Sequence, residues 1–298
     1  MDVLSKRAEV RLFKDRVRDV EEQVRRAAGA TEIINSRSYV KWPEPVLARV
    51  PSLRFITVCG IGTDAIDLVA ARSRGITVSN LPGRTAPVVA EHAFGLMLAV
   101  AKRAAWYTDQ IRQGRWVKKD LLLLSGKTIG IVGAGPIAQQ MAKLCRGIGM
   151  KVIAWTYHPS PERSRQTGLE FVSFDDLLAR SDVISLHLPL TDRSRRLLGR
   201  NEFARVKPGC VLINAGRGAL VDEAALVDAL NSGRLMGAGI DVYEQEPLPP
   251  GSPIAKCEQV VLTPHVADMT PEGLELLNEG VVENVLAFLD GKPQNVVN

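Results

Sequence analysis

Short apolar runs alternate with amphipathic stretches from Lys127 to the end of the chain. Runs of this length predict buried strands, and the amphipathic stretches between them predict helices. Strands that alternate with helices at this spacing form a parallel, doubly wound α/β sheet with right-handed crossovers. The predicted strands are Thr128–Val132, Val152–Trp155, Val183–Leu188, Val211–Asn214, Ala238–Val242 and Val260–Leu262.

Capping residues mark the ends of several predicted helices. Ser173 begins a Ser-x-x-Asp start, and Asp222 stands directly before the predicted helix Glu223–Asn231. Gly233 then ends that helix. An apolar helix over Val88–Lys102 leads into this part of the chain.

The first 80 residues repeat the alternation in shorter form and predict a second, smaller α/β domain. Its strands are expected at Val10–Phe13, Ile33–Asn35, Phe55–Val58 and Thr77–Val78, and its helices at Asp19–Ala28 and Ala65–Ser73. The amphipathic tail Pro271–Leu289 is expected to pack on it. We therefore predict one domain from residues 1–80 with 270–298, a second from 81–269, and a ligand cleft between them.

Composition places the chain among ordinary globular proteins, with 46% hydrophobic and 24% charged residues. The net charge of +5 comes without a nucleic-acid-binding motif, so no nucleic-acid partner is expected. Four widely separated cysteines favour neither disulfides nor a metal site. No apolar run is long enough for a signal peptide or a membrane span, so a cytoplasmic protein with no membrane partner is expected.

A glycine fingerprint stands between the first predicted strand of the larger domain and its helix. Gly133 allows a tight turn, Gly135 lets a pyrophosphate approach the backbone, and Ala138 lets the helix pack closely on the strand. Pro136 and Ile137 begin the helix, whose N-terminal N–H groups face the phosphates. This strand–turn–helix context predicts a dinucleotide site.

Three side chains that suit acid–base chemistry follow later predicted strands. Arg217 lies in a glycine-rich turn and can hold a carboxylate through two parallel hydrogen bonds. His265 can exchange a proton near neutral pH, and Glu246 can orient the imidazole. Each has a plainer interpretation as a surface arginine, a loop histidine or a solvated acid. Together with a dinucleotide they match oxidation of a 2-hydroxy acid or reduction of a 2-oxo acid.

Several motifs together resemble the D-isomer-specific 2-hydroxyacid dehydrogenase family. They are GIGTDAIDL, GITVSNLPGRTAPVVAEHAFGLML, VGAGPIA, SDVISLHLPLT, INAGRGALVDE, GAGIDVYEQEPL and VLTPHVAD. The resemblance runs from about residue 50 to the end. It implies a Rossmann-type domain inserted in a smaller flavodoxin-like substrate domain, and it gives Arg217, Glu246 and His265 the catalytic roles described above.

The resemblance also implies further site residues and an assembly. Asp241 is expected to contact the nicotinamide carboxamide, and the backbone around Cys59, Gly60, Ile61 and Gly62 to bind the substrate carboxylate. Residues expected to line the cofactor are Thr85, His187, Leu188, Pro189 and Ala215. Members of the family are usually homodimers through the segment matching residues 99–127. There Trp106, Tyr107, Trp116 and the 121–124 run supply apolar surface or cover the chain's own core.

Two departures from the family pattern bear on the cofactor and the substrate. Thr156, with Arg163 and Arg165 nearby, replaces the acid that binds the adenosine ribose, so NADP is at least as expected as NAD. Val58 and Asn35 stand where phosphoglycerate dehydrogenases carry arginines, although Arg37 is close. A small unphosphorylated acid such as glyoxylate or hydroxypyruvate is therefore favoured, with 3-phosphoglycerate dehydrogenase as the alternative. Asp268 is an extra acid that can restrict the substrate.

The N-terminus departs as well, because only about nine residues precede the segment AEVRLFKD. They match the end of a helix, so the first strand of the smaller domain is expected to be missing, either because the true start lies upstream or because the domain is incomplete. A second function class stays open: a corepressor-like protein that binds NAD(P) as a sensor. Cofactor binding without turnover would distinguish it from an enzyme.

Overall fold

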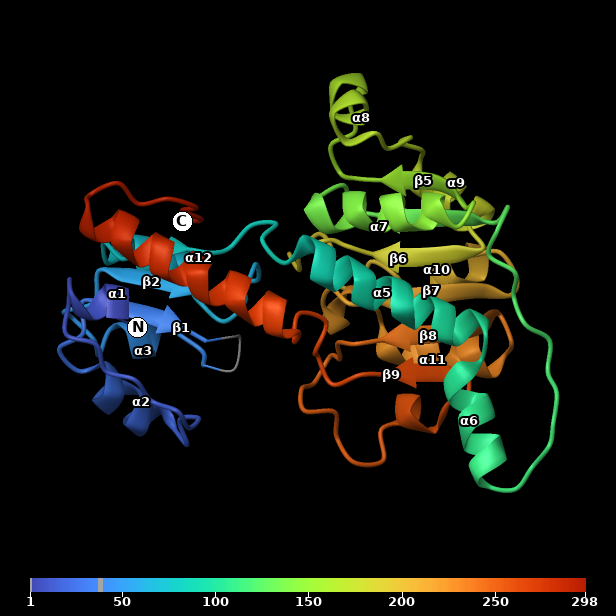
Figure 1. The fold of residues 1–298 in the computed structure, drawn as a ribbon, viewed down its shortest axis with the longest axis horizontal. Helices are drawn as coiled ribbons and strands as arrows, with labels where there is room; N and C mark the ends of the chain where they lie inside the picture. Colours follow the sequence, from blue (N-terminus) through green and yellow to red (C-terminus); the bar gives the residue numbers. More distant parts are fainter. Residues whose placement is uncertain (1, 37–39) are drawn as a thin grey trace. The chain divides into compact units, whose positions relative to one another are not determined.

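Six parallel strands form the sheet of the larger unit, in the order β5-β4-β6-β7-β8-β9 (Figure 1). Because β4 lies between β5 and β6, the chain runs from β4 to β5 on one side and then returns past β4 to β6 on the other. In doubly wound folds, ligands bind at the carboxyl ends of the strands where the order reverses in this way. The predicted doubly wound parallel fold is confirmed. The strands are β4 (Thr128–Val132), β5 (Lys151–Trp155), β6 (Val183–Leu186), β7 (Cys210–Asn214), β8 (Leu235–Ile240) and β9 (Val260–Leu262).

The computed structural model describes residues 2–36 and 40–298. The chain divides into two units, Met1–Thr85 with Thr270–Asn298 and Ala86–Met269. Helices of the larger unit are α5 (Ala86–Ala101), α6 (Ala104–Arg112), α7 (Pro136–Gly147), α8 (Pro161–Thr167), α9 (Phe174–Arg180), α10 (Arg200–Arg205) and α11 (Glu223–Asn231), with 3-10 turns η1 (Gly218–Leu220) and η2 (Pro253–Lys256).

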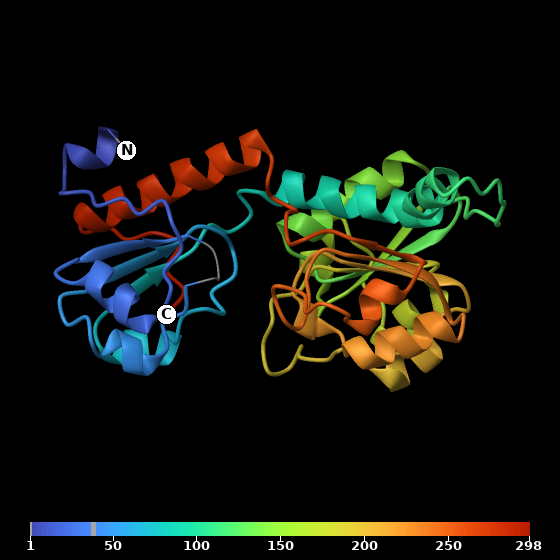
Figure 2. The ribbon, with the colours of Figure 1, turned by 90° about the horizontal axis from the view of Figure 1, so that it is seen from below.

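Strand residues of the larger unit point alternately to two separate cores. Ile131 and Ile213 pack under α5 and α7 on one face. Leu212 and Ile184 pack under α9, α10 and α11 on the other face. Figure 2 shows helices on both faces of this sheet. Each fully buried side chain of this kind contributes about 1.5–3 kcal/mol. A sheet that is buried on both faces leaves only its strand ends and loops for a ligand site.

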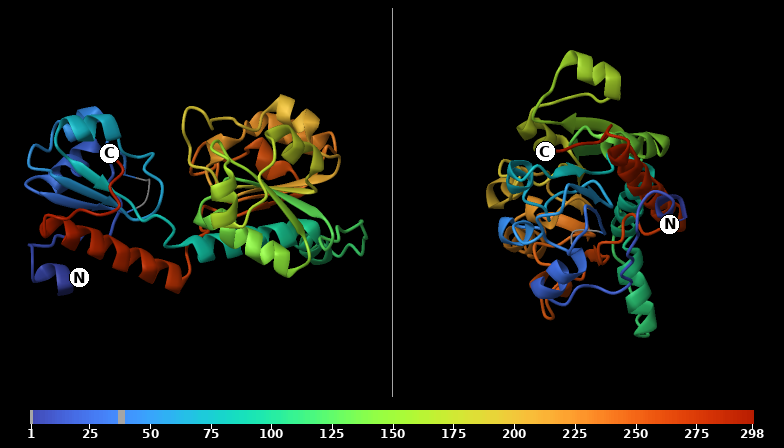
Figure 3. Two further views of the ribbon diagram at one scale, coloured as in Figure 1. Left: turned by 90° about the horizontal axis from the view of Figure 1, so that it is seen from above. Right: turned by 90° about the vertical axis from the view of Figure 1, so that its left-hand side faces the viewer.

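The smaller unit is built on three parallel strands in the order β1-β2-β3: β1 (Glu32–Asn35), β2 (Phe55–Val58) and β3 (Thr77–Ser79). Its helices are α1 (Asp2–Ser5), α2 (Val20–Ala27), α3 (Glu44–Leu47), α4 (Leu68–Ser73) and α12 (Pro271–Leu289). The long helix α12 lies along one face of this sheet (Figure 3), where Phe55 and Phe288 stack with ring centroids 4.5 Å apart. The predicted packing of the tail on the first domain is confirmed.

The predicted strand Val10–Phe13 is wrong, because these residues form neither helix nor strand. In the described part of the chain, none of the strands β1, β2 and β3 of the smaller sheet pairs with residues 10–13. The Phe13 ring instead lies under the Arg26 guanidinium, 4.7 Å from ring centroid to Cζ, and Leu12 is 62% exposed. An alternating apolar pattern makes a strand only where a neighbouring strand pairs with it.

A buried asparagine on α12 secures the smaller unit. The Asn284 side chain is fully buried and donates to Thr57 Oγ1 at 3.1 Å and to the Asn80 carbonyl at 2.9 Å. Its own oxygen accepts from Asn295 Nδ2 at 3.0 Å. Since buried amides are stable only when paired, this residue fixes α12 and the C-terminal residues against β2 and β3.

Among the described helices, none combines the length and the apolar content of a bilayer span.

Candidate active site

The predicted site residues of the larger unit follow the carboxyl ends of its strands. Parallel strands end at one edge of a sheet, so the loops that follow them gather there. Gly133 follows β4, Thr156 follows β5, His187 follows β6, Ala215 follows β7, Asp241 follows β8 and His265 comes shortly after β9.

The glycine fingerprint has the geometry that a pyrophosphate needs. Gly133 has φ +121°, and a Cβ there would lie 2.3 Å from the His187 carbonyl oxygen, so no larger residue fits. A Cβ on Gly135 would meet no protein atom within 4 Å, which leaves open space at the N-terminus of α7. No side chain caps that helix. Its first N–H groups and this open space therefore suit an anion such as the pyrophosphate of a dinucleotide.

Thr156, which is expected at the adenosine ribose, is 5% exposed and directly follows β5. Arg163 Nη1 donates to Thr156 Oγ1 at 3.1 Å and to the His158 carbonyl at 3.2 Å. Arg165 instead pairs with Glu162, 2.5 Å away, on the exposed side of α8. Arg163 is therefore held against Thr156, whereas Arg165 lies on the exposed side of α8.

Three other residues expected along the cofactor, at positions 187–189, lie in the loop that follows β6 at this edge. The His187 N–H donates to the Val132 carbonyl at 2.8 Å, and its Nε2 lies 2.9 Å from Ser185 Oγ. Burial lowers the pKa of His187 to about 4, so it is neutral at physiological pH and unsuited to proton exchange there. Leu188 and Pro189 follow it in the same loop, and Thr85 directly precedes α5.

The Arg217 turn is shaped by a buried asparagine and by a close backbone approach. Asn214 is 1% exposed; its Nδ2 donates to the Arg217 carbonyl at 3.0 Å, and its Oδ1 accepts from the Gly216 N–H at 3.1 Å. A Cβ on Gly218 would lie 1.9 Å from the carbonyl carbon of Tyr243, so only glycine fits there. Arg217 Nη1 donates to the Gly216 carbonyl at 2.7 Å.

Glu246 and His265 form the predicted carboxylate–imidazole pair, with Glu246 Oε2 2.7 Å from His265 Nδ1. Glu246 Oε1 accepts from the Tyr243 N–H at 3.1 Å. Burial alone would raise the pKa of Glu246, but the hydrogen bonds from His265 and Tyr243 and the charges of His265 and Arg217 outweigh it and lower the pKa below its usual value. Glu246 is therefore ionised at neutral pH, with Arg217 close enough to contribute.

Asp241 connects the Arg217 turn to the loop that carries His265. Its N–H donates to the Asn214 carbonyl at 2.9 Å, and its carbonyl accepts from the His265 N–H at 2.8 Å. The carboxylate is fully buried and accepts from the N–H groups of Val266 at 3.0 Å and Ala267 at 3.1 Å. His265 itself has φ +56°, a left-handed conformation that costs a non-glycine residue about 1–2 kcal/mol.

The predicted substrate loop belongs to the smaller unit and follows β2. The Cys59 N–H donates to the Asn35 carbonyl at 3.0 Å, the Gly60 carbonyl accepts from the Leu81 N–H at 2.9 Å, and the Ile61 carbonyl accepts from Asn80 Nδ2 at 2.7 Å. The Asn35 side chain is buried and accepts from Trp42 Nε1 at 3.0 Å. Arg37 lies outside the described residues. Gly62 ends the predicted loop.

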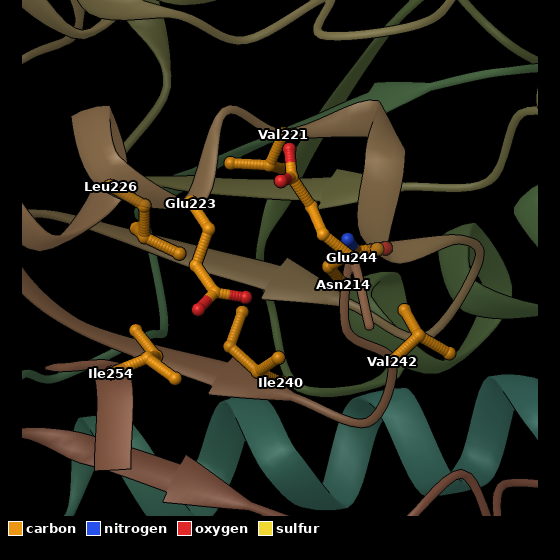
Figure 4. Close-up of a pocket in the computed structure, with 9 residues that line it drawn as sticks. Asn214, Val221, Glu223, Leu226, Ile240, Val242, Glu244 and Ile254 are labelled. Atoms are coloured by element: carbon orange, nitrogen blue, oxygen red, sulfur yellow. The ribbon is translucent and has the colours of Figure 1, made fainter. Parts of the chain in front are cut away.

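A small pocket behind the Arg217 turn has a volume of about 10 Å³, room for one water molecule and too little for a substrate. Figure 4 shows the Glu223 carboxylate near the hydrocarbon side chains of Leu226, Ile240 and Ile254. Within residues 2–36 and 40–298, no group of three histidine, cysteine, aspartate or glutamate side chains could hold a metal ion.

Sequence reasoning missed three residues that shape the site: Asn214, Thr263 and His92. The Thr263 hydroxyl donates to Asp241 Oδ1, and His92 Nε2 lies 3.1 Å from Thr263 Oγ1. The available signal for His92 was a polar side chain that, apart from the adjacent Glu91, stands among apolar and small residues in α5. From the sequence, Asn214 was predicted only as the last residue of a buried strand.

A comparison with known protein families finds a match over most of the larger unit. Residues 94–267 match the family model described as "D-isomer specific 2-hydroxyacid dehydrogenase, NAD binding domain". The chain belongs to this family. The dinucleotide that its larger unit binds is therefore NAD or NADP, and the predicted resemblance is confirmed.

Curated relatives include a glyoxylate reductase of Thermococcus litoralis, 41% identical over 87% of this chain and 81% of its own length. A D-3-phosphoglycerate dehydrogenase of Archaeoglobus fulgidus is 39% identical over 93% of this chain, and the chain spans only 53% of that relative's length. Among solved structures, an acyclic imino acid reductase in complex with NADPH and D-Arg has a TM-score of 0.91 and 28% identity, covering 100% of this chain and 94% of that one.

Replacing each of the two fingerprint glycines by alanine should affect cofactor binding and stability differently. We expect Gly135→Ala to leave the thermal unfolding midpoint unchanged but to weaken NADPH binding about tenfold or more, because its Cβ enters only the space over the helix N-terminus. Gly133→Ala should also lower the midpoint, because its Cβ clashes with the His187 carbonyl. Fluorescence titration and thermal unfolding measure both. Wild-type NADPH affinity in Gly135→Ala would contradict this placement of the pyrophosphate.

Proposed function

We propose that the chain is an NAD(P)H-dependent oxidoreductase that interconverts a small, unphosphorylated 2-oxo acid and its D-2-hydroxy acid, with glyoxylate- or hydroxypyruvate-like substrates. The observation that carries this proposal is the Glu246–His265 pair, whose carboxylate and imidazole are 2.7 Å apart at the same sheet edge as the glycine fingerprint and Arg217.

His265 is assigned the proton transfer through its Nε2 atom. An ionised carboxylate only accepts hydrogen bonds, so the partner atom Nδ1 carries a hydrogen. Nε2 is then the ring nitrogen that gives a proton to the substrate oxygen in reduction and takes it back in oxidation. The negative charge of Glu246 stabilises the imidazolium that holds this proton.

Arg217 is assigned the substrate carboxylate. Its guanidinium is anchored on the Gly216 carbonyl at 2.7 Å, and a guanidinium carries five N–H donors in a planar fork that matches a carboxylate. We infer that a carboxylate held there presents the neighbouring carbonyl or hydroxyl oxygen to His265, because Arg217 is near enough to Glu246, the partner of His265, to lower its pKa. In the Cys59–Gly62 loop, the N–H groups of Cys59 and Gly60 donate to the Asn35 and Val58 carbonyls, so any further contact with a substrate carboxylate is proposed for those of Ile61 and Gly62.

The dinucleotide is proposed to lie along the strand ends, with its pyrophosphate over Gly133, Gly135, Pro136 and Ile137. Other proposed contacts are Thr85, Thr156, His187, Leu188, Pro189, Ala215 and Asp241. When bound, the nicotinamide supplies or accepts the hydride. NADP is the favoured form, because Arg163 brings a positive charge to Thr156 and no acid stands there to repel a 2′-phosphate.

The preference for an unphosphorylated substrate rests on the smaller unit. Val58 is apolar and Asn35 is buried with its oxygen bonded to Trp42, so neither supplies the positive charge that a phosphate needs. 3-Phosphoglycerate dehydrogenase activity is the alternative, supported by the similarity to the Archaeoglobus fulgidus enzyme. Asp268 is proposed to narrow the choice of substrate further.

A homodimer in the cytoplasm stays a prediction. Trp106 and Tyr107 serve the chain's own fold, since Trp106 Nε1 donates to Glu258 and the Tyr107 hydroxyl donates to the Lys119 carbonyl. The apolar surface that supports a dimer lies farther along the segment, where Trp116 is 85% and Leu123 67% exposed. A dimer contact over this segment would bury these two side chains, which are otherwise exposed to water.

Removing the proposed proton donor should abolish turnover without loss of the cofactor. We expect His265→Ala to lower kcat for glyoxylate reduction about 100-fold or more, with NADPH affinity unchanged. Glu246→Gln should lower kcat by a smaller factor. The matched control is Glu244→Gln, two residues away, whose side chain pairs with Arg196 at 3.4 Å. Turnover in His265→Ala within tenfold of wild type would contradict the assignment. Tight cofactor binding with no wild-type turnover would favour the corepressor-like sensor.

Arg163 should control the choice between the two cofactors. Because a charge-assisted hydrogen bond contributes about 1.5–3 kcal/mol, Arg163→Ala should raise KM for NADPH about tenfold or more and leave KM for NADH nearly unchanged. Arg165→Ala is the matched control, because that side chain is paired with Glu162 on the exposed side of α8. An equal effect of Arg163→Ala on both cofactors would contradict a 2′-phosphate contact.

A further inference from the structure

His92 is a polar side chain in the middle of the apolar helix α5. Its neighbours Val89, Ala93 and Leu96 are buried in the core of the larger unit. The His92 side chain is 23% exposed, and its Nε2 atom lies 3.1 Å from Thr263 Oγ1 and 3.4 Å from Asp241 Oδ1. Helix α5 therefore contacts, through one imidazole, the ends of two strands that carry the proposed active site.

The direction of these hydrogen bonds follows from the number of hydrogens available. The Thr263 hydroxyl has one hydrogen, and it donates this hydrogen to Asp241 Oδ1. Thr263 Oγ1 can then only accept from His92, so His92 Nε2 must carry a hydrogen. The result is a chain of donors that runs from His92 through Thr263 to the Asp241 carboxylate.

The Asp241 carboxylate in turn fixes the loop that carries His265. Its two oxygens accept from the N–H groups of Val266 and Ala267, directly after His265, while Thr263 binds it from directly before that segment. Burial would raise the pKa of Asp241, but the nearby His92 side chain and the hydrogen bonds from Thr263 and Val266 outweigh it and lower the pKa. The carboxylate is therefore charged. It accepts hydrogen bonds from residues before and after His265, whose own backbone is left-handed.

We propose that His92 is a positioning residue of the active site: by donating to Thr263 it fixes the Thr263 hydroxyl on Asp241 and so holds the backbone conformation that aims His265. This inference rests on the proposed function. Without His92, the Thr263 oxygen lacks its donor and the hydroxyl is no longer restrained to point at the carboxylate. The loop that carries His265 can then move relative to the substrate, and a displacement of about 1 Å in a reacting group costs up to about 100-fold in rate.

A packing role for His92 makes a different prediction from a hydrogen-bonding role. His92→Leu fills a similar volume but removes the donor, while His92→Gln keeps an N–H donor at a similar reach from the helix. If only packing matters, His92→Leu should retain activity. If the donor matters, His92→Gln should be the better replacement. Thr263→Val removes the hydroxyl that joins the two partners with little change in shape.

The experiment measures kcat, KM and the thermal unfolding midpoint for His92→Leu, His92→Gln, Thr263→Val and the double variant His92→Leu/Thr263→Val, with glyoxylate and NADPH. We expect His92→Leu to lower kcat about tenfold or more and His92→Gln to recover most of that loss. Because both residues act through one chain of bonds, the double variant should lose no more than the worse single variant. Glu91→Gln, at the neighbouring exposed position of α5, is the matched control.

Wild-type kcat in His92→Leu would overturn the proposal, and so would losses that multiply in the double variant. If His92→Leu does not fold, Thr263→Val and the double variant His92→Gln/Thr263→Val provide the same test. A tenfold loss of kcat in Thr263→Val that is no larger in the double variant supports the proposal. Wild-type kcat in Thr263→Val overturns it. The wild-type protein is assayed first. Absence of wild-type turnover would contradict the proposed function, whereas an active wild type with an equally active His92→Leu contradicts only the role of His92.

Discussion

A fully buried carboxylate, that of Asp241, joins the segments of the proposed active site. Burying a charge is costly unless polar groups compensate for the lost water, and here N–H and hydroxyl groups of the following loop provide that compensation. The same residue bonds through its backbone to Asn214 on one side and to His265 on the other. The Arg217 turn and the His265 loop are therefore held by one residue at the end of β8, and the left-handed backbone of His265 is tolerated because its surroundings fix it.

Close backbone approaches set the remaining geometry. Gly133 lets the loop after β4 come near the His187 carbonyl, and Gly218 lets the Arg217 turn come near Tyr243. Tyr243 in turn donates its N–H to Glu246, so the spacing between the Arg217 turn and the Glu246 loop depends on the absence of a side chain at Gly218. A rigid sheet with both faces buried supports these loops, and the chemistry is left to the few side chains at its edge.

Much of this fold follows from local pattern. The six strands of the larger unit appear within a few residues of their predicted places, and Asp222 and Ser173 cap the helices they were expected to cap. The glycine fingerprint and the Glu246–His265 pair were also predicted. The strand expected at Val10–Phe13 failed because strand formation depends on a partner that a local pattern cannot supply. His92 and Asn284 were missed because the position of a polar residue in a helix does not indicate which distant group it meets, here Thr263 and Thr57.

The most direct test of the account is the rate of NADPH oxidation by the purified chain with glyoxylate, hydroxypyruvate and 3-phosphohydroxypyruvate offered in turn. Val58 is apolar and the Asn35 oxygen accepts from Trp42, so neither residue offers a positive charge to a phosphate. We therefore predict a higher kcat/KM for one of the two unphosphorylated acids than for 3-phosphohydroxypyruvate. A higher kcat/KM for 3-phosphohydroxypyruvate would contradict the proposed substrate class while leaving the catalytic pair in place. No oxidation of NADPH or NADH with any of the three acids would contradict the proposed enzyme function itself.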